Sequence, residues 1–122
     1  MSQADELQKR TDAFADLSIT FVQGLPDTAI ARRMAGQYQD AATSVGANYR
    51  AARRGRSHAE FTAKIGIVSE EADEAVFWLE RMRNAAIRSR TVELESLLAE
   101  AEELARIFGA SLRTARSRVR RR

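Results

Sequence analysis

Cysteine is absent from this 122-residue sequence, and histidine, proline and tryptophan each occur once. The absence of cysteine excludes disulfide bonds, thiolate metal sites and a cysteine nucleophile. The single histidine, His58, excludes any metal site that needs two histidines. We therefore expect no metal, no cofactor and no catalytic residues, and the composition argues against most classes of enzyme.

Long apolar runs are also missing. No uncharged stretch approaches the roughly 18 residues that a membrane-spanning helix needs. The first ten residues include Asp5, Glu6, Lys9 and Arg10, and they lack the apolar core of a signal peptide. These absences predict a protein of the bacterial cytoplasm without a membrane partner.

Glycine and proline are scarce, so the breaks between helical segments are few. The first break falls at residues 24–27, where Pro26 cannot continue the preceding helix. Either Asp27 or Thr28 can then cap the next helix, because both side chains accept hydrogen bonds from free backbone N–H groups.

Two further breaks carry recognisable capping residues. At residues 54–57, Gly55 suits a left-handed C-terminal cap, and Ser57 with Glu60 has the spacing of a capping box. A weaker break falls at residues 89–91, where Thr91 is the expected N-cap. The chain is thereby divided into four long segments.

Apolar residues within these segments recur at alternating steps of three and four, the period of an amphipathic helix. Leu17 and Ile30 are members of the first two stripes. We expect a single domain, 1–122, with helices at about 4–23, 28–53, 58–88 and 92–118; the charges of residues 117–122 favour a disordered basic tail. Short connections predict an all-α, antiparallel up-down-up-down four-helix bundle.

The third segment has more apolar residues than one stripe can use. Ile67, Phe77 and Trp78 lie off its main stripe, where a surface helix normally carries polar residues. Either this helix is the most central one of the bundle, or these residues form an interface with another subunit. The second interpretation predicts a homo-oligomer.

Glycines inside the predicted helices indicate close helix packing. If the second and third helices turn back near residue 55, Gly46 lies level with Gly66. Two glycines at one level would let the helix axes approach closely, and we favour this structural role over a ligand cavity.

Two possible chemical sites have simpler explanations. His58 lies in the first turn of the third helix without a well-placed nucleophile, which argues against catalysis. The acidic cluster of the same helix lacks the histidines of a di-iron bundle. In the expected bundle, Asp73 of this cluster lies level with Arg106 of the fourth helix, which predicts an ion pair between them. The cluster comprises Glu70, Glu71, Asp73 and Glu74.

Arginine accounts for 18 of the 20 basic residues, although the net charge is only +3. In the expected topology, the second loop and the C-terminus emerge at the same end of the bundle, so ten arginines gather there. Such a cluster is typical of proteins that bind a phosphate backbone, although an arginine-rich proteome would also explain the composition. The predicted contacts are Arg50, Arg53, Arg54, Arg56, Arg113, Arg116, Arg118, Arg120, Arg121 and Arg122. No aromatic residues interleave with them, so neither base stacking nor sequence-specific readout is expected.

Residues 43–57, TSVGANYRAARRGRS, resemble the four-helix bundle proteins related to the 23S ribosomal RNA intervening-sequence protein. The resemblance continues through Glu60-Phe61 and through residues 63–68, 70–74 and 77–80. It covers most of the chain, from about Phe14 to Phe108.

This resemblance implies a non-enzymatic antiparallel bundle that assembles as a ring-shaped homopentamer. A related branch of the family is the accessory protein of diversity-generating retroelements, which binds nucleic acid and a reverse transcriptase. We therefore expect a homo-oligomer whose arginine-rich end binds RNA or DNA. The alternative is a scaffolding ring that binds a protein, such as a reverse transcriptase, without a direct nucleic-acid role.

Overall fold

The computed structural model describes residues 1–85, 87 and 91–120, with the backbone alone at 119 and 120. The described residues form four α-helices and no strand. The helices are α1 (Gln3–Gln23), α2 (Ala29–Arg53), α3 (His58–Asn84) and α4 (Thr91–Arg120).

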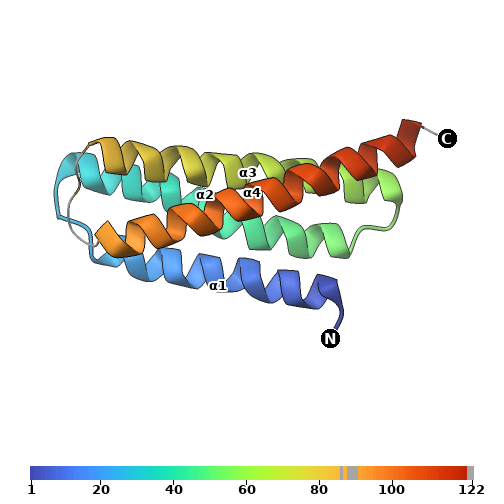
Figure 1. Ribbon diagram of the computed structural model, residues 1–122, viewed down its shortest axis with the longest axis horizontal. Coiled ribbons are helices and arrows are strands. Elements are labelled where there is room, and N and C mark those ends of the chain that lie inside the picture. The colour runs from blue at the N-terminus through green and yellow to red at the C-terminus, as the bar shows by residue number, and fades with distance from the viewer. Residues whose placement is uncertain (86, 88–90, 121–122) are drawn as a thin grey trace.

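The four helices run antiparallel in chain order, so that both termini and the α2–α3 loop lie at one end (Figure 1). Each helix packs against its neighbours in sequence, and α1 also contacts α4. Among the described residues, the backbones of α2 and α4 do not approach closely, and the two helices meet only through core side chains such as Tyr49 and Phe108. The helices therefore occupy the corners of a square, with α2 and α4 on one diagonal.

The observed helix ends differ from the predicted ones at the third connection and at the C-terminus. Thr28 is the N-cap of α2, and its hydroxyl accepts from the N–H of Ala31 at 3.2 Å. Helix α3 ends at Asn84, short of the predicted residue 88. Helix α4 continues to Arg120, into the stretch expected to be disordered, and residues 121 and 122 lie outside the described residues.

The α2–α3 loop is built differently from the prediction. Arg54 is the C-cap, and Gly55 does not have a positive φ, so the left-handed cap is wrong. Space explains the glycine, because a Cβ there would lie 3.1 Å from the carbonyl oxygen of Ala52. Ser57 caps α3 by accepting from the N–H of Glu60, but the Glu60 carboxylate accepts from the N–H of Arg56 at 2.6 Å.

The buried aromatic side chains of the core come from α1, α2 and α4, whereas the buried side chains of α3 are small or aliphatic, with Met82. Tyr38 is fully buried and packs edge-on against Phe14 and Phe21, at centroid distances of 6.5 and 6.2 Å. Its hydroxyl is 2.7 Å from that of Ser18, which is also buried. The hydrogen bond satisfies both polar groups inside the core.

Two residues of the predicted apolar stripes are not in the core. Leu17 is 62% exposed and Ile30 is 59% exposed. Both lie near the end of the bundle that holds the α1–α2 connection, and Leu17 lines a cleft between α1 and α4 with Val92. The apolar spacing therefore predicted the helices correctly, but it did not predict that these two residues of the stripes would be exposed.

The predicted pairing of Gly46 with Gly66 is wrong. A Cβ at Gly46 would lie 3.0 Å from Asp12 Oδ1 and 3.3 Å from Thr11 Oγ1, so this glycine faces α1. Gly66 faces α4, where Leu112 is the nearest neighbour. Gly46 therefore permits the close approach of α1 to α2.

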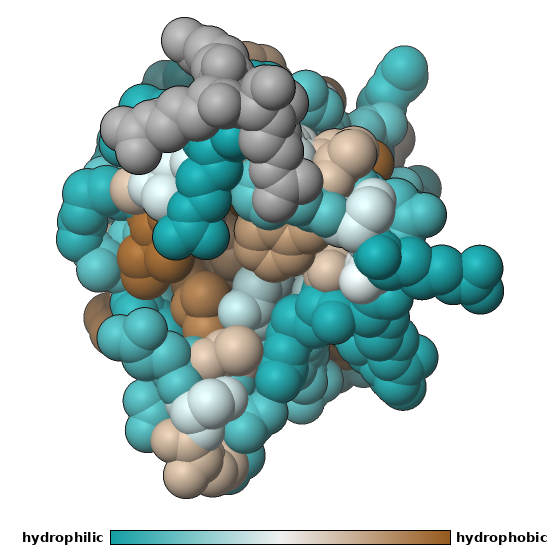
Figure 2. All heavy atoms as spheres, turned by 90° about the vertical axis from the view of Figure 1, so that its right-hand side faces the viewer, coloured by the Kyte–Doolittle hydropathy of each residue, from teal (hydrophilic) through white to brown (hydrophobic). Residues whose placement is uncertain are grey.

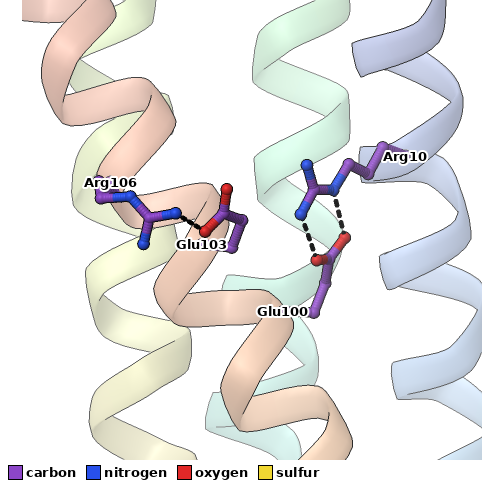
Figure 3. Close-up of polar contacts among 4 residues, drawn as sticks. All are labelled: Arg10, Glu100, Glu103 and Arg106. Carbon is purple, nitrogen blue, oxygen red and sulfur yellow. Dashed lines mark hydrogen bonds and ion pairs between the residues drawn. The ribbon is translucent and has the colours of Figure 1, made fainter.

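An ion pair joins α1 to α4 on the most open side of the bundle. The guanidinium of Arg10 donates two hydrogen bonds of 2.7 Å to the carboxylate of Glu100 (Figure 3). This bidentate contact raises the pKa of Arg10, mainly through the hydrogen bonds to Glu100. Clefts on either side of it are lined by residues of both helices.

Candidate nucleic-acid interface

The end of the bundle that carries both termini presents mainly hydrophilic side chains around a smaller apolar area (Figure 2). The last turn of α2, which carries Arg50 and Arg53, and the α2–α3 loop reach this end, together with the last turns of α4. Basic residues at helix C-termini also interact favourably with the helix dipole. That effect accounts for single residues near a helix end but not for a cluster drawn from two helices and a loop.

Three of the predicted residues line one cleft between α1 and α2. Arg50, Arg53 and Arg54 come from the last turn and C-cap of α2, and the cleft has a volume of about 590 Å³. Helix α1 contributes Gln8 and Asp12 to its wall. The arginines share this cleft because the spacing of three and four residues places them on one side of the helix.

Arg53 is the most constrained of the three. Its Nη2 lies 2.6 Å from Oδ1 of Asp5, and its guanidinium lies 5.9 Å from the ring centre of Tyr49. The hydrogen bond from Arg53 is the main cause that lowers the pKa of Asp5. Tyr49 is only 7% exposed and packs against Phe108, so it offers no face for base stacking.

Gln8 anchors the wall of the cleft on α1. Its Nε2 donates to the carbonyl oxygen of Gly46 at 3.2 Å and to Asp12 Oδ1 at 3.0 Å. Its Oε1 is buried and has no hydrogen-bond partner among the described residues. Asp12, the other acceptor of Gln8, is also the side chain that a Cβ at Gly46 would crowd, at 3.0 Å. The sequence showed no signal for the contact between Gln8 and Gly46.

The remaining predicted arginines lie elsewhere on the same end. Arg56 is exposed in the α2–α3 loop, and Arg113, Arg116 and Arg118 are exposed on α4. Because α2 and α4 are diagonal, the α4 arginines lie across the end from the cleft. Arg120 is described by its backbone alone, and Arg121 and Arg122 lie outside the described residues.

His58 has a structural contact. Its Nε2 donates to the carbonyl oxygen of Ala115 at 3.0 Å, which joins the start of α3 to the end of α4. Its ring stacks on Phe61 at a centroid distance of 6.3 Å. The half-buried His58 side chain therefore contacts both the end of α4 and Phe61 of its own helix.

The predicted ion pair between Asp73 and Arg106 is wrong, because Arg106 pairs with Glu103 on its own helix (Figure 3). Among the described residues, none of the four acids of the α3 cluster forms an ion pair. Partial burial raises the pKa of Glu71, and the nearby carboxylates of Glu74, Glu70 and Asp40 add to the effect. No group of three potential ligands suited to a metal ion occurs within the described ranges.

The three apolar residues of α3 are not equivalent. Phe77 is 45% exposed and Ile67 is at the border of exposure, whereas Trp78 is half-buried against the core. Phe77 lies edge-on to Trp78 at 5.1 Å, and the Arg81 guanidinium lies 4.8 Å from the Phe77 ring centre. Trp78 Nε1 donates to Glu74 Oε1 at 3.4 Å. A partly exposed apolar surface is thus present on α3.

No helix within the described residues is both long enough and apolar enough to cross a membrane. No protein-family model matches the sequence, and no curated protein matches it.

Among solved structures, the chain is similar to a protein of unknown function from the S23 ribosomal protein family of Bacteroides thetaiotaomicron. The two share 24% sequence identity with a TM-score of 0.81, and the match covers 92% of this chain and 99% of that one. This likeness confirms the all-α four-helix fold, and the structural neighbour comes from the 23S ribosomal RNA intervening-sequence type of family that residues 43–57 resemble.

Proposed function

We propose that this protein is a non-enzymatic, homo-oligomeric four-helix bundle that binds the backbone of RNA or DNA through its arginine-rich end. The observation that carries the proposal is the α1–α2 cleft, where Arg50, Arg53 and Arg54 lie together. Arginine suits this role because its planar, permanently charged guanidinium can donate two hydrogen bonds to one phosphate.

The chemistry of the cleft favours backbone recognition over base recognition. Its wall offers three guanidinium groups and no aromatic side chain, and the nearby aromatic ring of Tyr49 is covered. Contacts to phosphates carry no sequence information by themselves. We therefore expect binding that depends weakly on sequence and strongly on ionic strength.

Assembly would strengthen the effect. In a ring-shaped homopentamer, the assembly that the family resemblance implies, symmetry repeats the arginine-rich end around the axis. Several copies of one basic cleft would raise the local positive potential and allow one strand to contact more than one subunit.

The test is the triple variant R50A/R53A/R54A, which removes the three cleft arginines, measured by fluorescence anisotropy with a short single-stranded RNA. Each lost phosphate contact removes a charge-assisted hydrogen bond worth roughly 1.5 kcal/mol. Affinity should fall by at least about tenfold, with an unchanged helical circular dichroism spectrum.

A matched control removes three arginines from the opposite end of the bundle. Arg32, Arg33 and Arg83 lie near the start of α2 and the end of α3, so R32A/R33A/R83A has the same net charge as the first variant. The control should keep most of the affinity. Equal losses in both variants would mean that net charge alone governs binding and that the cleft is not the site.

The second candidate is a ring that binds a protein, such as a reverse transcriptase, and it is favoured by the exposed apolar surface of α3. Phe77 and Ile67 are exposed there, beside the guanidinium of Arg81. The same surface could instead join subunits, which is the interface role proposed for Ile67, Phe77 and Trp78. The mass of the protein in solution distinguishes a subunit interface from a binding site for another protein.

Light scattering should give a mass of about five times the 13.6 kDa chain for the wild-type protein. The double variant I67S/F77S should shift the protein towards smaller species, whereas L17S, which alters a still more exposed leucine on α1, should not. A wild-type mass of one chain would refute the ring and leave the α3 surface free for a different protein.

A further inference from the structure

Asp5 already occupies the position that a phosphate would take at Arg53. The carboxylate oxygen lies 2.6 Å from Nη2 of Arg53, a distance typical of a charge-assisted hydrogen bond. It is the one ion pair that the three cleft arginines form within the described part of the chain.

The fold of α1 holds Asp5 in this position. Ser2 and Asp5 form a complete capping box: the Ser2 hydroxyl accepts from the N–H of Asp5, and Asp5 accepts from the N–H of Ser2 at 3.3 Å. The close approach of α1 to α2 at Gly46 then brings the first turn of α1 beside the end of α2.

We propose that Asp5 is an internal competitor of the nucleic-acid backbone, and that a backbone phosphate binds the α1–α2 cleft by replacing the Asp5 carboxylate at Arg53. The inference rests on the proposed function and adds a regulatory element to its site. A phosphate that replaces Asp5 gains Arg53 and also meets Arg50 and Arg54, which have no carboxylate partner among the described residues.

Solvent exposure makes this exchange inexpensive. Asp5 and Arg53 are both at the surface, with side-chain exposures of 47% and 30%, so either group is rehydrated when the pair opens. Exposed ion pairs contribute little net free energy, because water competes for both charges. A multivalent phosphate strand can therefore displace a single carboxylate that is part of the chain.

The experiment compares D5N with the wild-type protein in the RNA-binding assay at low ionic strength. The amide side chain of the D5N variant keeps an oxygen that accepts from Ser2 but loses the charge that holds Arg53. We expect affinity to increase about two- to fivefold, the range that an exposed pair represents. D5Q is a second variant, since glutamine at this position of a helix also completes a capping box.

The control is D16N, which makes the same charge change on α1 at an exposed residue outside the cleft. It should change affinity by less than half as much. A double-mutant cycle with R53A completes the test: the gain from D5N should disappear when Arg53 is absent.

The outcomes separate the two claims. If R53A weakens binding but D5N and D16N have equal effects, or if the D5N gain persists without Arg53, Asp5 is no competitor and the proposed function stands. If neither wild-type protein nor D5N binds RNA at low ionic strength, the proposed function itself fails. Inorganic phosphate at millimolar concentration should displace RNA weakly; displacement as strong as that by competitor RNA would assign the cleft to free phosphate instead.

Discussion

The buried hydroxyl groups of Ser18 and Tyr38 form a hydrogen bond with each other in the core. Their oxygens are 2.7 Å apart, and both side chains are fully buried. Burial is the main cause that raises the pKa of Tyr38, and the hydrogen bond with Ser18 opposes it only in part. Removal of one partner leaves a buried polar group without a hydrogen bond.

We therefore predict that S18A or Y38F alone lowers the free energy of unfolding by about 1–3 kcal/mol. The double variant S18A/Y38F should be more stable than the sum of the two single changes implies, because neither hydroxyl is then left unsatisfied. Chemical denaturation of all four proteins measures this coupling; strict additivity would mean that the hydroxyl pair contributes nothing.

Glycine positions give a second test at single residues. Gly36 is exposed with open space around a Cβ, whereas a Cβ at Gly46 would crowd Asp12 and Thr11. G36A should stabilise the protein by up to about 1 kcal/mol through helix propensity. G46A should give a smaller gain or a loss, since Thr11 is buried and cannot move freely. Equal changes in melting temperature for G36A and G46A would show that the close approach of α1 to α2 leaves room for a Cβ at residue 46.

At the level of the helix, α3 carries carboxylates that repel one another. Glu71 is half-buried near Glu74, Glu70 and Asp40, and its pKa is raised above the usual value. A group with a raised pKa stabilises the folded state below its unfolded pKa, and this contribution is lost as the pH rises through the folded pKa. The partial burial of the charged Glu71 carboxylate, and to a smaller degree its repulsion by the neighbouring carboxylates, thus destabilise the folded state at neutral pH.

E71Q should therefore stabilise the protein at pH 7 by up to about 0.5 kcal/mol, and the gain should shrink as the pH falls below the pKa of glutamate. Thermal unfolding across this pH range gives the comparison. A gain that is constant with pH would assign the effect to packing and not to charge.

The sequence allowed prediction of the helices but not of how they face one another. Apolar spacing and the residues around Pro26, Thr28 and Ser57 predicted the number and order of helices, because these signals are local. The partners of Gly46 and Arg106 were wrong, since the rotation and level of one helix against another depend on packing along its whole length. The Asp5–Arg53 pair was missed for the same reason: it joins residues 48 positions apart.

For the whole molecule, the order of the helices brings many of the arginines to one end of the bundle, although the net charge is small. The net charge is only +3, yet the α2–α3 loop and the end of α4 meet where Figure 1 shows both chain termini. The sequence predicted this gathering from the order of the helices alone. It could not separate the α1–α2 cleft from the arginines of α4, the helix at the corner of the bundle opposite α2.

The most direct test of backbone binding at this end is the salt dependence of RNA affinity. For a single strand, the logarithm of the association constant falls with the logarithm of salt concentration by about 0.7 per phosphate contact. Three cleft arginines predict a slope of about −2 or steeper for the wild-type protein, and a shallower slope for R50A/R53A/R54A. A slope near zero, or no binding at low ionic strength, would contradict a phosphate-binding role.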